Sequence, residues 1–398
     1  MTVRKLYYED PYIQEFSTSI VENNIDDNGR AYVVLKETAF YPTGGGQPND
    51  TGYINGIKVT GAEELGDEIR HYVEGAIDET EVKGTIDWGR RFDHMQQHSG
   101  QHILSAAFRH SLGIDTAAFH LGREISTIDL TVEQLTDEMA SKAEMLANEI
   151  VFSNKPIEIQ WVRKEDLHQY PLHKEPSVEE NIRLVIIPEV DYNGCGGTHP
   201  RQTGEIGTIK ILSWEKHKKM VRLHFVCGGR VIVQLHQKQN IIQSLTKTMN
   251  SPEIQLPEAA EKLLQAQKEL SKSLEETKDQ LLEYEASALA VDSDGLIAAS
   301  FEDRTLQEIQ KLGKAIVSKN DQAVCLLTAK NGEMLQFFAA RGKDSGVNLK
   351  VYAKDVLALI NGKGGGSETA VQGGSLSSMS SEKLLSSMKL LFSKAAEQ

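Results

Sequence analysis

Two short motifs that lie far apart in the chain constrain its fold more than any other feature. The stretch HMQQHSGQHIL places histidines at positions 94, 98 and 102, and NGCGGTH places Cys195 four residues before His199. On a helix, residues four apart lie on the same face. Thiolate and imidazole pairs from distant segments are typical of tetrahedral zinc sites. The sequence therefore predicts a Zn²⁺ site that brings these two segments together.

The motifs alone leave two questions open. The first is whether they form a metal site at all, since the alternative is that Cys195 is a small buried side chain beside a glycine turn and the histidines form an ordinary helical face. The second is which of the three histidines bind the metal. His98 and His102 lie next to the apolar run ILSAAF and hence nearer the buried side, whereas His94 lies a turn earlier, beside charged residues. The spacing favours His98 and His102 without excluding His94.

The first half of the chain is expected to begin with strands and to continue with mixed elements. AYVVLKETAFYP is a β-branched and aromatic run, and TGYINGIKVTG has the pattern of a strand, an Asn-Gly turn and a second strand. The intervening PTGGGQPND is too rich in glycine and proline for a regular element. A helix is expected over 93–112, and a second one opened by the capping-box pattern Thr131-x-x-Gln134. Further strands are expected in KPIEIQWV, RLVIIPEV, GTIKILSW and VRLHFVCGGRVIVQL.

From Leu256 to Ala288 the apolar positions follow an alternating four-three spacing, which is the heptad seam of a coiled coil. Such a helix either pairs with a second chain, giving a homodimer, or packs back within its own chain. The remaining residues alternate helix and strand. The sequence thus predicts an α+β fold. It comprises a β-barrel-like subdomain over 1–90, an α/β zinc-binding domain over 91–240, a helical coiled-coil-like linker over 252–290 and a small C-terminal α/β domain over 291–398.

Composition limits how this chain can bind a polyanion. Its 398 residues carry a formal charge of −14, of which −11 falls within residues 1–240. A general nucleic-acid binder is usually basic, so contact with nucleic acid must depend on local patches. The best patch is WEKHKKMVRLHF, with Lys216, Lys218, Lys219 and Arg222, unless this is only a solvated hairpin.

The sequence also indicates where the chain works. No apolar run reaches the length of a membrane span, and the N-terminus lacks a signal-peptide core, so no membrane association and a cytoplasmic location are expected. The three cysteines are odd in number and far apart, which does not indicate a disulfide framework.

Five motifs together resemble one family. HSGQH with CGGTH resembles the paired zinc motif of alanyl-tRNA synthetase editing domains and of the free-standing AlaX-type alanyl-tRNA editing proteins. TAFYPTGGGQPNDTG is similar to the glycine-rich signature near the start of that editing module, and FHLGREISTIDL and TGEIGTIKIL are similar to strands that follow its two metal motifs. GKGGGSETAVQGG resembles the glycine-rich motif of the DHH-associated domain that ends alanyl-tRNA synthetases. The motifs occur in the family's order and span nearly the whole chain.

The resemblance implies roles for particular residues. The zinc ligands would be His98, His102, Cys195 and His199, with His94 a neighbour. Thr38 would recognise the hydroxyl of a serine substrate, and the pocket would be lined by Gly44, Gly45, Gly46, Gln47 and His120. At the position of His120 the synthetases usually carry an amide side chain. The C-terminal motif would contact tRNA through Lys363, Gly364, Gly365 and Gly366, although this chain lacks the Arg-Pro that often follows the glycines.

The implied function is an editing hydrolase that removes serine, or glycine, from the acceptor end of tRNA for alanine, tRNA(Ala). Because the editing-like strands begin almost at Met1 and leave no room for an aminoacylation core, we expect an enzyme that acts in trans. Two other functions remain: a non-catalytic, zinc-stabilised tRNA-binding protein, and an editing hydrolase of the threonyl type. Four protein ligands leave open whether the zinc is catalytic or structural.

Overall fold

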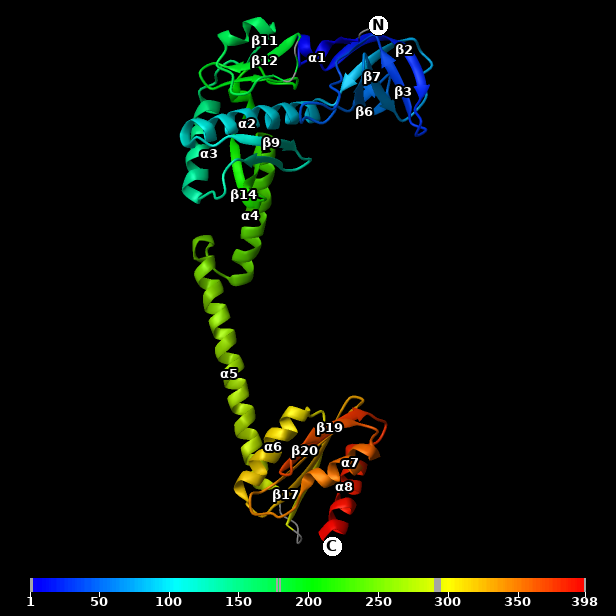
Figure 1. The fold of residues 1–398 in the computed structure, drawn as a ribbon, viewed down its shortest axis with the longest axis vertical. Coiled ribbons are helices and arrows are strands. Elements are labelled where there is room, and N and C mark those ends of the chain that lie inside the picture. Colours follow the sequence, from blue (N-terminus) through cyan, green and yellow to red (C-terminus); the bar gives the residue numbers. More distant parts are fainter. Residues whose placement is uncertain (1–2, 177, 179, 290–294, 397–398) are drawn as a thin grey trace. The chain divides into compact units, whose positions relative to one another are not determined.

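The computed structural model describes residues 3–176, 178, 180–289 and 295–396, and the chain divides into two compact units, Met1–Ser244 and Leu245–Gln398. Both units combine sheets and helices, so the mixed α and β composition expected from the sequence is observed (Figure 1). No helix among these residues has the length and apolar character that crossing a membrane requires. The predicted boundary at 290/291 lies outside the described residues.

The first unit begins with a closed barrel. Its strands, in spatial order, are β2 (Glu15–Ile25), β3 (Ala31–Leu35), β7 (Glu68–Val73), β6 (Ile57–Leu65), β5 (Gly52–Ile54) and β8 (Glu81–Ile86). Asn55 and Gly56 join β5 to β6 with φ of 45° and 81°, the left-handed conformation that a two-residue hairpin turn requires. Short α1 (Leu6–Glu9) follows β1 (Arg4–Lys5), which pairs in parallel with β4 (Glu37–Thr38).

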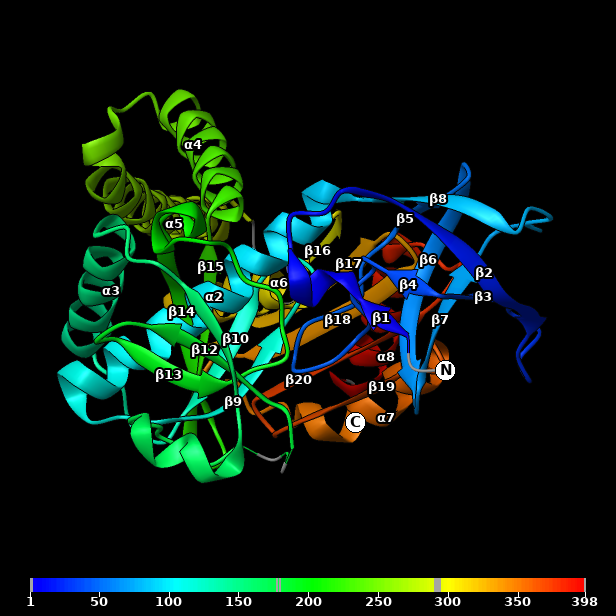
Figure 2. The same ribbon diagram turned by 90° about the horizontal axis from the view of Figure 1, so that it is seen from above.

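The long helix α2 (Trp88–Leu112) connects the barrel to the rest of this unit. Asp87 caps its start by accepting a hydrogen bond from the Arg90 backbone N–H, and Gly113 ends it with φ 67°. The helix lies against a four-stranded sheet (Figure 2). In spatial order the strands of this sheet are β14 (Ile209–His217), β15 (Met220–Cys227), β10 (Ser126–Leu130) and β9 (Thr116–Leu121).

Further elements complete the surroundings of α2. A three-stranded sheet has the order β11 (Glu158–Val162), β12 (Ile182–Ile187) and β13 (Asp191–Gly194). Helix α3 (Asp137–Phe152) packs on α2 and shares its apolar core. The remaining elements are the 3-10 turns η1 (Lys164–Gln169) and η2 (Thr203–Ile206) and the helix α4 (Gly229–Met249).

Three expectations for these elements were wrong. The first helix begins at Trp88, not near 93, because Asp87 caps it. The second begins at Asp137, since Thr136, not Thr131, accepts the capping hydrogen bond, from the Met139 N–H. The predicted strand VRLHFVCGGRVIVQL ends at Cys227, where Gly228 turns with φ 56° and α4 follows. The β-branched residues of the stretch RVIVQL favour a strand, which is why the sequence predicted one there. In the structure these residues begin α4, and none of the α4 side chains is buried.

The second unit is a five-stranded sheet with helices on both faces. The strand order is β16 (Leu296–Glu302), β17 (Val324–Asn331), β18 (Met334–Arg341), β20 (Ala370–Leu376) and β19 (Lys363–Gly366). One face packs on α6 (Leu306–Lys319) and on the end of α5 (Leu256–Ala288), which follows the turn η3 (Glu253–Gln255). The other face packs on α7 (Leu349–Leu359) and α8 (Ser381–Ala396). Two separate cores therefore sandwich this sheet.

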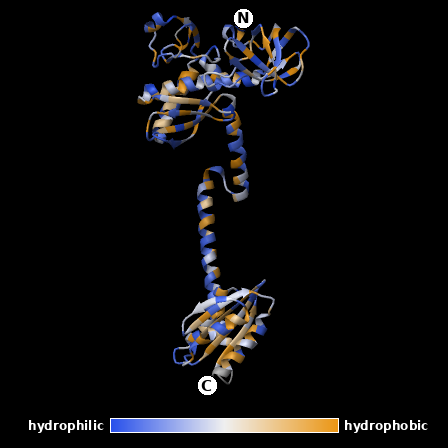
Figure 3. Cartoon of the chain, turned by 45° about the vertical axis from the view of Figure 1, so that its right-hand side comes forward, coloured by the Kyte–Doolittle hydropathy of each residue, from blue (hydrophilic) through white to orange (hydrophobic). Residues whose placement is uncertain are grey.

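Helix α5 spans the range of the predicted heptad seam, but the seam is not what packs. Leu282 and Ala286, which are not seam positions, are its buried residues and contact the α6 side of the sheet. Seam residues Leu270 and Leu281 are 72% and 62% exposed. Apolar and polar residues alternate along α5 (Figure 3). Only the end of the helix packs within its own unit, through a different face, so the choice between the two alternatives for the seam stays a prediction.

Candidate metal centre

Four side chains from the two sequence motifs meet beneath the surface of the first unit. His98 and His102 come from α2, and Cys195 and His199 follow β13. One ligand atom of each lies within 4.8 Å of the others. Cys195 Sγ lies 3.4 Å from His98 Nε2 and 3.3 Å from His199 Nε2. The arrangement of one sulfur and three imidazole nitrogens around a common point could hold a metal ion.

An outer layer of hydrogen bonds fixes the three imidazole rings. The Nδ1 of His98 donates to Gln47 Oε1 at 2.9 Å, and the Nδ1 of His102 donates to Asp191 Oδ2 at 2.9 Å. These bonds leave Nε2 of each ring as the free lone pair, the second-sphere pattern of metal-bound histidines. His102 Nε2 is buried and has no hydrogen-bond partner among the described residues. A buried polar nitrogen without a partner is costly unless it binds something, which fits a metal ligand.

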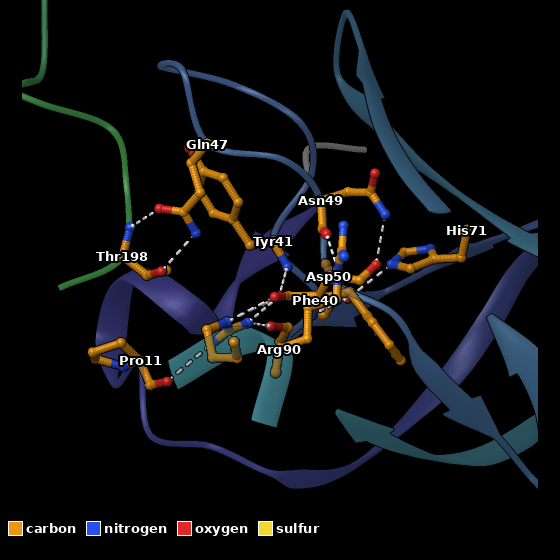
Figure 4. A network of polar contacts seen from close by, with 12 residues as sticks. Pro11, Phe40, Tyr41, Gln47, Asn49, Asp50, His71, Arg90 and Thr198 are labelled. Atoms are coloured by element: carbon orange, nitrogen blue, oxygen red, sulfur yellow. Dashed lines mark hydrogen bonds and ion pairs between the residues drawn. The ribbon is translucent and has the colours of Figure 1, made fainter. Parts of the chain in front are cut away.

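His199 is fixed in the same way, and a glycine makes room beside His98. The Nδ1 of His199 lies 2.8 Å from Ser99 Oγ. A Cβ at Gly197 would lie 2.3 Å from His98 Cε1, so the CGGTH motif needs glycine there for close approach. Thr198, the next residue, binds Gln47 through its N–H and its hydroxyl, at 3.1 and 2.8 Å (Figure 4). Gln47 therefore joins the two metal motifs to the glycine-rich turn.

The electrostatics of the cluster favour a thiolate. Burial raises the pKa of the Cys195 thiol, but the nearby His98 and His199 outweigh burial and hold this pKa well below its ordinary value. Burial lowers the pKa of His199 to about 3, so this imidazole is neutral at pH 7. Burial lowers the pKa of His102, but the hydrogen bond to Asp191 outweighs it and raises this pKa to about 10, so His102 would release a proton on binding a metal. A thiolate and neutral imidazoles are the ligand forms that metals require.

His94, the first of the three histidines in HMQQHSGQHIL, lies outside the cluster. It is 4% exposed, and burial together with Arg90 lowers its pKa to about 4. The four clustered side chains do not include it.

The glycine-rich turn reaches the cluster, whereas the other predicted pocket residues do not contact it. Gly44 bridges to Gln47, and Gly46, with φ 80°, leaves only 3.1 Å between a would-be Cβ and the Phe119 ring. Phe119 packs on His98 at 5.5 Å between ring centroids. His120 is exposed and points to the opposite face of β9, because side chains alternate along a strand.

Thr38 is fully buried and already engaged. Its hydroxyl lies 2.8 Å from His71 Nε2 and accepts from the Phe40 N–H at 3.1 Å. His71 Nδ1 faces the Val33 carbonyl at 3.2 Å, so the Nε2 is the acceptor and Thr38 donates to it. The single proton of the Thr38 hydroxyl is therefore committed, and a substrate hydroxyl would have to donate to Thr38.

The predicted basic patches differ in their availability. Lys216, Lys218 and Lys219 are exposed on the β14–β15 hairpin. Arg222 instead forms a bidentate ion pair with Asp129, at 2.8 and 2.9 Å, and its charge is compensated. The motif at 363–366 forms β19, an exposed edge strand of the second unit.

Sequence reasoning missed the residues that support the cluster. Asp191 and Arg183 belong to no recognisable motif, and Ser99, although it lies within HSGQH, was assigned no role. The Arg183 guanidinium is buried, donates to the Cys195 carbonyl at 2.6 Å and stacks on the Tyr8 ring at 4.9 Å. Asp191 lies four residues before Cys195, but this spacing alone does not predict that its carboxylate meets His102. That contact depends on the pairing of β13 with β12.

Comparison with known proteins places this arrangement in a class. Residues 182–223, which include Cys195 and His199, match the family described as the threonyl and alanyl tRNA synthetase second additional domain. The part of the chain that carries Cys195 and His199 therefore resembles a domain of threonyl and alanyl tRNA synthetases. The match covers a small part of the chain, and full-length relatives narrow the class further.

The relatives point to one family. The chain is 31% identical to the alanyl-tRNA editing protein AlaX-L of Pyrococcus horikoshii, over 93% of this chain and 94% of that protein. It is 33% identical to the alanine–tRNA ligase of Pyrococcus abyssi, over 93% of this chain but only 42% of the ligase. It is 36% identical to the alanyl-tRNA editing protein Aarsd1-A of Xenopus laevis, over 61% and 60%. The chain belongs to the alanyl-tRNA editing protein family, and spans about two fifths of the ligases that it matches.

Proposed function

We propose that this protein is a trans-editing hydrolase that deacylates mischarged tRNA(Ala), removing serine or glycine, with Zn²⁺ bound by His98, His102, Cys195 and His199. The observation that carries the proposal is the buried ligand cluster, in which every imidazole has an outer hydrogen-bond partner. Outer partners of this kind are typical of metal-bound histidines, because they fix the tautomer and the orientation of each ring.

Zinc is the metal that the donor set favours. One thiolate with three imidazoles suits Zn²⁺, a borderline-soft ion that prefers tetrahedral sulfur and nitrogen ligands. When bound, such an ion supplies Lewis acidity that can polarise water or an ester carbonyl. The residues of this chain supply the rest: Gln47 and Asp191 orient the imidazoles, and the turn at 44–46 forms one wall beside Phe119.

Selectivity against alanine requires a group that recognises the extra hydroxyl of serine. We infer that Thr38 is that group, with the serine hydroxyl donating to the Thr38 oxygen, since its own proton is bound to His71. The Thr38 oxygen already accepts from the Phe40 N–H, so the serine hydroxyl would add a second hydrogen bond to it. Alanyl ester cannot form this bond, and the difference would favour the seryl ester. The exposed lysines at 216, 218 and 219, and the strand at 363–366, would contact the tRNA backbone.

Deacylation of three charged tRNAs tests the proposal. Seryl-, glycyl- and alanyl-tRNA(Ala) are incubated with the wild-type protein, with Cys195→Ala and with a matched control, Cys325→Ala, which alters a buried cysteine of the second unit. We expect the wild type and the control to release serine or glycine in preference to alanine, and Cys195→Ala to lose zinc and at least a hundredfold in rate. Release of none of the three amino acids by the wild type overturns the proposal.

Two additions to this experiment, a tRNA-binding measurement and seryl-tRNA for threonine as a fourth substrate, address the two other functions. Stoichiometric zinc and tRNA binding without turnover would favour a zinc-stabilised tRNA-binding protein. Preferential release of serine from tRNA for threonine would favour the threonyl type. The full-length match to AlaX-L and the matches to alanine–tRNA ligases support the alanyl substrate.

A further inference from the structure

A second polar cavity lies one helical turn from the metal cluster. Its volume is about 470 Å³, and its walls include Arg90, Arg123 and Arg230 with His94, Asp93 and Pro48. His94 precedes the ligand His98 by four residues on α2, a rise of about 5.4 Å along the helix axis. Pro48 follows Gln47, which binds His98. The cavity and the cluster are therefore built on the same two segments.

Two of the three arginine charges in this cavity are uncompensated. Arg230 forms a bidentate pair with Asp93, at 2.8 and 2.6 Å, and also donates to the Gly122 carbonyl. The Arg90 side chain donates only to the Asn49 carbonyl, at 2.9 Å (Figure 4). Arg123 is exposed and forms no ion pair with any residue that the structure describes. A positive cavity within the −11 balance of residues 1–240 calls for an anionic ligand.

His94 supplies an independent sign of a ligand. Its side chain is almost fully buried, and its Nδ1 has no hydrogen-bond partner within the described part of the chain. Buried polar groups normally have a partner. An anion with several oxygens in this cavity would accept from the imidazole and from the guanidinium forks of the arginines, the geometry that phosphate recognition uses.

We propose that the arginine pocket (Arg90, Arg123, Arg230 and His94) binds the phosphate on the 5′ side of the terminal, aminoacylated nucleotide of the substrate. This inference rests on the proposed function, because that function puts the ester at the metal cluster. A phosphate and the 3′ oxygen of the same nucleotide are separated by one ribose, a span comparable with the single helical turn between His94 and His98. The pocket thus anchors the nucleotide while the cluster faces the ester.

Two small substrates isolate the phosphate. One is the 3′-seryl ester of adenosine, and the other is the same ester of adenosine 5′-monophosphate. For the wild type we expect a higher kcat/KM with the phosphorylated ester, through a lower KM. Arg90→Ala and Arg123→Ala should each reduce that preference about tenfold, the effect of a lost charge-assisted hydrogen bond. Arg123→Lys should retain part of it, and the control Arg30→Ala, on the barrel hairpin, all of it.

A binding measurement separates this inference from the proposed function. Calorimetry with adenosine 5′-monophosphate, adenosine and inorganic phosphate should show that the nucleotide binds more tightly than the nucleoside, and that Arg123→Ala removes the difference. If neither seryl ester nor seryl-tRNA is hydrolysed but this phosphate-dependent binding persists, the proposed function fails and the pocket remains a phosphate site. If the wild type hydrolyses the two esters with equal kcat/KM, the proposal that the arginine pocket binds the nucleotide phosphate is wrong. This holds even if the protein binds inorganic phosphate.

Discussion

Helices α2 and α5 are both long, and they use their surfaces in opposite ways. Of the 25 residues of α2, 14 are buried, among them His94, His98 and His102, although its sequence is mostly polar. The 33 residues of α5 bury only Leu282 and Ala286, although leucines recur along it. The difference shows that burial in this molecule depends on partners from other segments, and not on the apolar character of the helix itself.

The polar side chains of α2 are buried because each finds a partner. Arg91 pairs with Asp50 and donates to the Pro11 and Ala39 carbonyls, and Gln97 binds both backbone groups of Cys227. In α5, Lys262 instead pairs with Glu258 on the solvent face, an interaction worth only a few tenths of a kcal/mol. Substitutions in the two helices should therefore differ greatly in effect.

The largest effect is expected from His102→Ala in α2. This change removes a ligand and leaves the Asp191 carboxylate buried without its imidazole partner, at a cost of about 3 kcal/mol. Zinc content, measured by mass spectrometry of the purified protein, should fall from one ion per chain to below about a tenth. The control His236→Ala, an exposed histidine of α4, should keep both its zinc and its melting temperature. A fully loaded His102→Ala protein would contradict the assignment of this ligand.

A smaller effect is expected one layer further out, from Asp191→Asn. The amide is nearly the same size but removes the negative charge that orients His102. Outer-sphere changes of this kind typically weaken metal affinity by 10–100-fold. Competition with a chelator at fixed pH measures the affinity. An unchanged zinc affinity would mean that α2 needs no partner from β13 to hold its ligands.

Thr38→Val tests whether a buried polar side chain of the barrel also depends on its hydrogen-bond partners. The substitution keeps the shape but leaves His71 Nε2 and the Phe40 N–H without a partner, so unfolding should cost about 1–2 kcal/mol less. Zinc content should not change, while the preference for seryl over alanyl ester should fall. Thr38→Ser retains the hydroxyl and is the matched control. If Thr38→Val is destabilised but equally selective, Thr38 serves the barrel alone.

These contrasts also explain what the sequence could predict. The two motifs indicated that histidines of one helix face meet Cys195 and His199, because residues four apart on a helix are neighbours whatever the remaining fold. Their spacing did not exclude His94, and only the resemblance to the editing family implied His98 and His102 as the pair found in the cluster. The Asn-Gly turn and the extent of α5 followed from local patterns as well. The partners Gln47, Asp191 and Ser99 meet the histidines only through tertiary pairing, 51, 89 and 100 residues away in the chain. The arginine pocket draws on α2, on the loop at Gly122 and on α4, so no local pattern could indicate it.

The smallest effect on stability is expected from the double substitution Leu270→Glu and Leu274→Glu in α5. Both side chains are exposed, by 72% and 53%, so the free energy of unfolding of the chain should change by less than about 0.5 kcal/mol. The heptad spacing, however, predicts that a second copy covers this stripe, and glutamates in a coiled-coil seam would then repel. Light scattering should show a dimer for the wild type and a monomer for the double variant, with Glu276→Gln, a residue between seam positions, as the control. If wild type and variant have the same mass, the stripe is not an interface between copies, and α5 is a helix held chiefly by its end on α6.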